Sequence, residues 1–197
     1  MKNIFIFGLL TLSCFAQTAI VVKHKAAPGG VSLFYGPGCN GVATNTCTVQ
    51  TTDQATVSRY PVGAAFTTGN NAAGYSLNAC GVYQSAIATS PNNVMRCAIY
   101  SGSPPTTKIC EVTADATLAA NSWTENTSFA GCTLNANTTY WIFSGTPNNS
   151  NTYRRAASGS GGYYFGLGSE VWPSIFRTPI TATSTNLYSQ YVRLTAK

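Results

Sequence analysis

Carboxylates are the first side chains to consider for catalysis, and this 197-residue chain has only five. Glycoside hydrolysis needs two facing carboxyl groups about 5–9 Å apart. Asp115 and Glu125 meet that requirement if a hairpin carries them, because diagonal neighbours on one face of an antiparallel pair lie about 7–8 Å apart. With amide or backbone oxygens the same pair could hold Ca²⁺, although no dense acidic loop supports this. We prefer the simpler interpretation of two hydrated surface acids.

Nucleophilic catalysis and zinc binding lack their usual residues. The sole histidine, His24, precedes the first predicted strand, so a Ser-His-Asp or Cys-His site would have to recruit it from there. No C-x-x-C pair occurs, which argues against a zinc site. We therefore expect a non-catalytic protein with no metal or other cofactor.

Aromatic side chains are more abundant, at 12% of the residues. Trp and Tyr rings pack against the apolar C–H faces of sugars, while Arg, Asn and acidic groups bond to the hydroxyls. The candidates for a glycan-binding surface flank a glycine-rich stretch, residues 156–162, where we expect loops. They are Trp172 first, then Tyr153, Arg154, Arg155, Tyr163 and Tyr164. If Tyr163 and Tyr164 lie in a strand they point to opposite faces, so at most one of them is free to bind.

The beginning of the chain predicts export. Lys2, an apolar run over residues 4–15 and the small residue Ala16 form the three-part pattern of a secretory signal peptide. The run is shorter than the about 20 apolar residues that span a bilayer, and no later segment suits a membrane anchor. We expect cleavage after Ala16, which leaves an extended leader (residues 17–30) and a single domain (residues 31–197). A lipoprotein acylated at Cys14 is the alternative.

Charge gives little indication of a partner. Charged residues make up 8% of the chain, against about 25% in ordinary soluble domains. The formal net charge of +6 includes Lys2, which leaves with the predicted signal peptide. Basic residues are scattered, with only Arg154 and Arg155 adjacent, and this is not the basic stripe that nucleic-acid binding requires. We expect no nucleic-acid partner.

Six cysteines follow the predicted signal peptide, and an even number in an exported chain predicts three disulfides. If Cys80 pairs with Cys97 across a hairpin, the loop falls on residues 84–93, which are rich in turn residues. If the next two cysteines pair in the same way, the turn centres on Asn121. We therefore favour sequential pairing: Cys39–Cys47, Cys80–Cys97 and Cys110–Cys132.

The remaining pattern is typical of strands joined by turns. Short runs rich in Val, Ile, Tyr, Phe and Thr alternate with Gly, Pro and Asn clusters, and no window repeats apolar residues at helical spacing. The predicted strands are residues 31–35, 46–51, 64–68, 74–83, 95–100, 109–118, 122–129, 138–144, 163–166 and 188–196. So many short strands predict an all-β fold, an antiparallel, jelly-roll-like β-sandwich.

Residues 74–144 resemble extracellular jelly-roll modules of cell-surface and adhesive proteins. The resembling features are a Tyr-Ser-Gly turn at residues 100–102, Pro104-Pro105, Trp123 at the start of a strand, and residues 133–142, which lead into a Tyr-Trp strand. The resemblance implies a β-sandwich of the kind used in adhesive or glycan-binding architectures. It transfers no catalytic residue.

Three function classes remain open at this point. The leading hypothesis is a secreted, non-catalytic sandwich that binds glycan or an extracellular surface through loop aromatics. The alternative is a structural or adhesive component that self-assembles in an extracellular layer without a small ligand. A glycoside hydrolase using Asp115 and Glu125 comes third. Sequons at Asn126, Asn137 and Asn148 matter only in a host that glycosylates.

Overall fold

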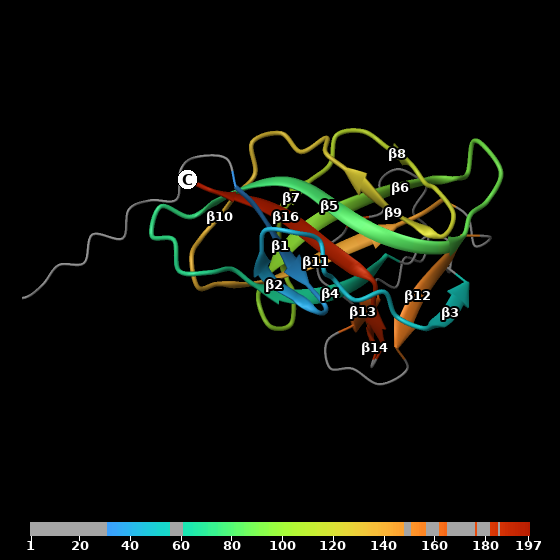
Figure 1. Ribbon diagram of the computed structural model, residues 1–197, viewed down its shortest axis with the longest axis horizontal. Helices are drawn as coiled ribbons and strands as arrows, with labels where there is room; N and C mark the ends of the chain where they lie inside the picture. Colours follow the sequence, from blue (N-terminus) through green and yellow to red (C-terminus); the bar gives the residue numbers. More distant parts are fainter. Residues whose placement is uncertain are drawn as a thin grey trace, which may run out of the picture.

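The computed structural model describes most of the predicted domain as strands and connecting turns (Figure 1). The described residues are 31–55, 61–147, 151–156, 162–164, 176, 182–184 and 186–197. Within them the chain forms strands β1 to β16 and no helix, and so no helix that could cross a membrane. The predicted signal peptide and leader lie outside the described residues.

Two antiparallel sheets pack as a sandwich. The nine-stranded sheet has the order β15-β12-β5-β16-β1-β2, and β9 and β10 also pair with β5 while β3 pairs with β12. Its strands are β1 (Ser32–Gly36), β2 (Cys39–Val42), β3 (Thr52–Ala55), β5 (Tyr75–Ala86), β9 (Ser122–Asn126), β10 (Thr133–Leu134), β12 (Thr152–Ala156), β15 (Leu187–Tyr188) and β16 (Gln190–Ala196). In Figure 1, β16 (red) runs between β5 (green) and β1 (blue).

The seven-stranded sheet has the order β14-β13-β4-β11-β6-β7, and β8 pairs with β6. Its strands are β4 (Val62–Thr67), β6 (Val94–Ser101), β7 (Thr107–Glu111), β8 (Ala116–Thr117), β11 (Thr139–Gly145), β13 (Gly162–Tyr164) and β14 (Ala182–Ser184). The all-β sandwich predicted from the sequence is therefore confirmed.

The main core lies between the sheets because alternate residues of the long strands are apolar. Val82 of β5 and Val192 of β16 meet Ile99 and Ile142 of the other sheet in this core. Strand β11 is buried on both faces, since Tyr140 and Ile142 join the main core while Trp141 and Phe143 form a second cluster with Tyr100 and Phe176. Burial on both faces explains why this strand reads as a continuous apolar run.

The three disulfides have the predicted sequential pairing, but their place in the fold differs from the predicted one. Cys80 on β5 and Cys97 on β6 belong to different sheets, with Cα atoms 6.7 Å apart. The bridge between Cys110 and Cys132, whose Cα atoms are 6.0 Å apart, also links the sheets, because it joins β7 to the residue before β10. The hairpin arrangement was therefore wrong for both. Disulfides of this kind form and persist in oxidising, extracellular environments.

Several strand boundaries also differ from the prediction. Residues 46–51 contain no strand, and Cys47 among them closes a small loop by its bridge to Cys39. The predicted strand over residues 109–118 is interrupted between β7 and β8, where Val112 makes only an isolated bridge to Phe129. Asn121 does form the expected turn, with a left-handed φ of 52°. Strand β12 lies where a loop was predicted.

Candidate functional site

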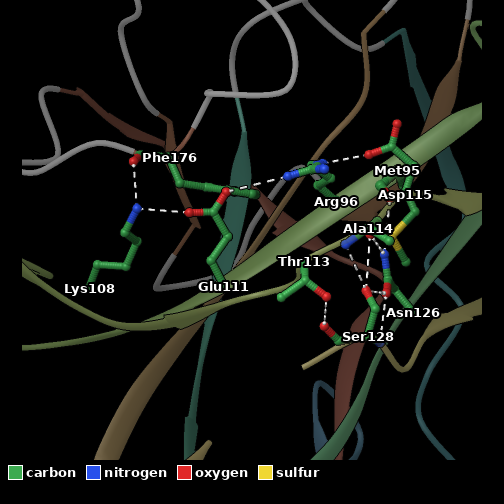
Figure 2. Close-up of polar contacts among 10 residues, drawn as sticks. All are labelled: Met95, Arg96, Lys108, Glu111, Thr113, Ala114, Asp115, Asn126, Ser128 and Phe176. Atoms are coloured by element: carbon green, nitrogen blue, oxygen red, sulfur yellow. Dashed lines mark hydrogen bonds and ion pairs between the residues drawn. The ribbon is translucent and has the colours of Figure 1, made fainter. Parts of the chain in front are cut away.

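Asp115 and Glu125, the candidate hydrolase pair, point to different parts of the molecule. Arg96 on β6 donates from Nε to Asp115 Oδ1, and Figure 2 shows Asp115 at one end of a row of ion pairs. The row continues with Arg96 Nη1, which lies 3.9 Å from Glu111 Oε1, and with Lys108 Nζ, which lies 2.8 Å from Glu111 Oε2. Lys108 also donates to the carbonyl oxygen of Phe176. The ion pairs connect β6 with β7 and with the Asp115 segment, and the Lys108 hydrogen bond connects them to Phe176 of the second apolar cluster.

The neighbouring residue Asn126 shows why the two carboxylates do not face each other. Its Nδ2 donates to the carbonyl oxygens of Ala114, at 2.9 Å, and Met95, at 3.3 Å (Figure 2). The segment that carries Asp115 therefore lies on the Asn126 side of β9. Since successive side chains of a strand point to opposite faces, Glu125 points away from it. The diagonal pairing of Asp115 with Glu125 was wrong, because β9 pairs with β5 instead.

Three of the residues proposed for the loop surface lie on strand β12 instead. Tyr153 is a core residue, 1% exposed, and its hydroxyl lies 3.1 Å from Ser144 Oγ, so its ring offers no face to an external ligand. Arg154 pairs with Asp53 at 3.1 Å, and Arg155 donates to Asn186 Oδ1 at 2.6 Å. These positions belong to β12, whose alternation buries Tyr153, and this corrects the prediction of a loop there.

The three remaining candidates for the loop surface are Tyr163, Tyr164 and Trp172. Tyr163 and Tyr164 form part of β13, which pairs with β4 and β14. Trp172, the leading candidate of the sequence analysis, lies outside the described residues, as does most of the glycine-rich stretch.

The sequons also differ in accessibility. Asn126 is 2% exposed, and its amide nitrogen bonds to two main-chain carbonyl groups, so it is inaccessible in the folded protein. Asn137 is exposed in a turn with a φ of 48°. Asn148 lies outside the described residues.

The nine-stranded sheet brings aromatic residues together on its outer face. Cys80, Val82 and Val192 point into the main core, so their strand neighbours point outward. Tyr83 of β5 is directly opposite Trp123 of β9. The remaining outward residues in register are Gly81 opposite both Glu125 and Tyr191, and Arg193 opposite Phe34.

Four rings from four strands contact one another in a row, which we call the aromatic face: Phe34, Tyr83, Trp123 and Tyr191. The ring centroids of Phe34 and Tyr191 are 5.2 Å apart, those of Tyr191 and Trp123 are 4.9 Å apart, and those of Trp123 and Tyr83 are 5.7 Å apart. Tyr191 is buried in contact with the Cys39–Cys47 bridge, and the other three rings are half-buried. Each ring is thus held by its neighbours, and the row keeps part of its surface toward solvent.

Gly81 allows Tyr191 to lie flat across the sheet. A Cβ atom at Gly81 would lie only 2.2 Å from Cζ of Tyr191, so the tyrosine ring occupies the space above this glycine. In that position the hydroxyl of Tyr191 crosses β5 and donates to Glu125 Oε1 at 2.9 Å. The glycine therefore sets the orientation of the central ring.

An ion pair adjoins the rings. Arg193 donates from Nε to Glu125 Oε1 at 3.0 Å and from Nη2 to Oε2 at 2.8 Å, which is the two-bond geometry of strong Arg–carboxylate pairs. The hydrogen bond that Arg193 donates to Glu125 raises the pKa of Arg193. Burial, followed by the charge of Glu125, raises the pKa of Tyr191. Both groups therefore remain protonated hydrogen-bond donors at physiological pH.

Trp123 and Glu125 stand out in the sequence for other reasons, whereas Phe34, Tyr83 and Tyr191 do not stand out in it. The pattern that could have indicated this face is the Trp-x-Glu spacing of β9 and the Tyr-x-Arg spacing of β16. Such spacing places a ring and a charge side by side on the face away from the core. It does not show which strands are neighbours.

No metal site accompanies the aromatic face: within the described ranges, no group of three His, Cys, Asp or Glu residues could hold a metal ion. Comparison with known proteins assigns the chain to no family, since no protein-family model matches it and no curated protein matches it significantly.

Proposed function

We propose that this protein is an exported, non-catalytic β-sandwich that binds glycan on the aromatic face of its nine-stranded sheet. The observation that carries the proposal is the row of contacting rings, three of them half-buried, beside the Glu125–Arg193 pair. Aromatic rings usually contribute to the stability of a fold by being buried in its core. Rings gathered on the solvent side of a sheet are instead suited to a ligand with apolar faces.

Sugars match both kinds of group on this surface. Their C–H faces can pack on the half-buried rings of Tyr83 and Trp123, and their hydroxyl groups can bond to the polar atoms of Arg193 and Glu125. The rings are already fixed by contact with each other and with Tyr191, so binding would order few side chains. Surfaces that are pre-organised in this way lose less affinity to conformational entropy.

Two further observations support the export and the class of ligand. The predicted signal peptide and the three disulfides agree on an oxidising compartment. The resemblance of residues 74–144 to extracellular jelly-roll modules points to cell-surface or adhesive surroundings, where glycans are common ligands. A signal peptide is tested by mass spectrometry of the secreted protein, which should begin at Gln17.

The experiment is a glycan array with the purified mature protein, followed by titration of the best ligand. Trp123→Ala and Tyr83→Ala should each weaken binding at least about tenfold, which corresponds to about 1.4 kcal/mol. Ile109→Ala is the matched control, because Ile109 is an exposed apolar residue, 38% exposed, on β7 of the other sheet. Thermal unfolding verifies that all three variants are folded.

The proposal is wrong if the folded wild-type protein binds no glycan. It is equally wrong if the variants at Trp123 and Tyr83 bind as tightly as the Ile109 variant. Intrinsic fluorescence gives a second measurement, since Trp123 is half-buried whereas Trp141 is 6% exposed. A ligand on the aromatic face should shift the emission of the wild-type protein, and this shift should be absent in Trp123→Ala.

A further inference from the structure

Within the strands that the structure describes, the aromatic face carries no net charge. Five strands build it and its margin, β1, β2, β5, β9 and β16, and Glu125 and Arg193 are the only charged residues in them. These two form a pair with two hydrogen bonds, at 2.8 and 3.0 Å. The charges within these described strands therefore cancel.

The hydrogen-bonding capacity of the pair is only partly used. Glu125 accepts two bonds from Arg193 and one from Tyr191, while a carboxylate has about four acceptor positions. A guanidinium has about five N–H donors, and only two of those of Arg193 point to Glu125. The pair thus behaves as a neutral polar group that offers both donors and an acceptor beside the rings.

The rings are spread across the strands rather than along one of them. Trp123 lies on β9 and Phe34 on β1, with β5 and β16 between these two strands. The centroid distances of 5.2 and 4.9 Å place the rings of Phe34 and Trp123 at most about 10 Å apart. A row of this length can contact two consecutive sugar rings of an extended chain.

From these observations we propose that the ligand is an uncharged polysaccharide, bound as an extended chain across the strands. This inference rests on the proposed glycan-binding function and names its ligand class. An uncharged chain offers hydroxyl groups to both members of the ion pair and needs no counter-charge. An acidic polymer gains no net attraction from a neutral face and brings its carboxylates or sulfates close to Glu125, which repels them.

The test compares neutral polymers (β-glucan, mannan and xylan) with acidic ones (polygalacturonate and heparin). Binding of each to the mature protein is measured by affinity electrophoresis and calorimetry at about 0.05 M and about 0.5 M salt. We expect binding to at least one neutral polymer, with an affinity that changes less than about twofold between the two salt concentrations. Hexasaccharides of that polymer should bind at least about tenfold more tightly than its monosaccharide, because they reach more than one ring.

Glu125→Gln provides the variant. It leaves the charge of Arg193 unbalanced, so it should bind acidic polymers at low salt and lose that binding at high salt. Asp115→Asn is the matched control, because it removes a carboxylate from another arginine pair, that of Arg96, away from the aromatic face. The control should leave the preference for neutral polymers unchanged.

The outcomes separate the two proposals. If the wild-type protein prefers acidic polymers and Trp123→Ala abolishes that binding, the inference of an uncharged ligand is overturned while the glycan-binding function stands. If no polymer and no array glycan binds, both are overturned. Should Glu125→Gln not fold, the salt dependence of the wild-type protein decides the question without it.

Discussion

Gly81→Ala tests the arrangement on which the aromatic face depends. The substitution adds one methyl group beneath the ring of Tyr191, 2.2 Å from Cζ and 2.4 and 2.7 Å from the two Cε atoms. The backbone of Gly81 is not in the left-handed region, so alanine meets no conformational obstacle there. Without the ring, a glycine-to-alanine exchange at a compatible position stabilises a protein by about 0.4–1 kcal/mol.

The ring has little freedom to avoid the new methyl group. To restore an ordinary contact of 3.4 Å, Cζ of Tyr191 must move by about 1.2 Å. Phe34, Trp123 and the Cys39–Cys47 bridge pack against the ring and oppose that movement. The movement also disrupts the bond to Glu125. A lost hydrogen bond to a charged group costs about 1.5–3 kcal/mol and overpacking about 1–3 kcal/mol, so we expect a loss of about 2–4 kcal/mol in the free energy of unfolding.

Urea unfolding of a double-mutant cycle measures the effect. Gly81→Ala is made in the wild-type protein and in Tyr191→Leu, which removes the far end of the ring. The loss of about 2–4 kcal/mol should appear only in the wild-type background, whereas in Tyr191→Leu the substitution should be neutral or slightly stabilising. An equal loss in both backgrounds would refute the reasoning, because the ring could not then be its cause. The m-value should stay constant across the cycle.

Two further predictions concern the rest of the sandwich. Replacing Cys80 and Cys97 together by alanine opens a loop with a sequence separation of 17, so urea unfolding should show a loss of about 3 kcal/mol; a loss below about 1 kcal/mol would contradict a bridge between the sheets. Burial, followed by a hydrogen bond with Tyr75, raises the pKa of Tyr35 to about 12. Because the unfolded state then loses this proton first, the stabilisation is complete below about pH 10 and is lost as the pH rises to about 12. Tyr35→Phe should reduce the slope of the unfolding free energy against pH in that window, and an unchanged slope would count against the assignment.

The fold was predictable from local patterns, and its strand neighbours were not. Apolar alternation indicated β5, β6, β11 and β16 within a few residues because these strands contribute one or both faces to a core. The cysteine pairing was also correct, although its hairpin rationale was not. Cα atoms 6.7 Å apart suit a bridge within a sheet or between sheets equally well, so a separation of 17 residues cannot distinguish them.

The candidate site was less predictable, for a reason that Tyr153 and Tyr83 illustrate. Both are tyrosines next to polar residues, yet one lies in the core and the other on the outer face of the same sheet. The difference depends on which face of the strand meets the other sheet. The aromatic face needs β9, β5, β16 and β1 side by side, and this neighbourhood depends on long-range pairing such as Gly81 with Tyr191. No local pattern contains that information.

The pairing of β1 with β16 has a mechanical consequence. Ser32 at the start of β1 lies opposite Thr195 near the end of β16. Tension applied to the two ends of the chain would therefore break the hydrogen bonds of this ladder one after another, rather than all at once. The bridges Cys80–Cys97 and Cys110–Cys132 keep tension off the loops that they close. Tyr83 lies inside the first of these loops and Trp123 inside the second. Half of the aromatic face would thus stay on an unstretched segment while the terminal strands yield.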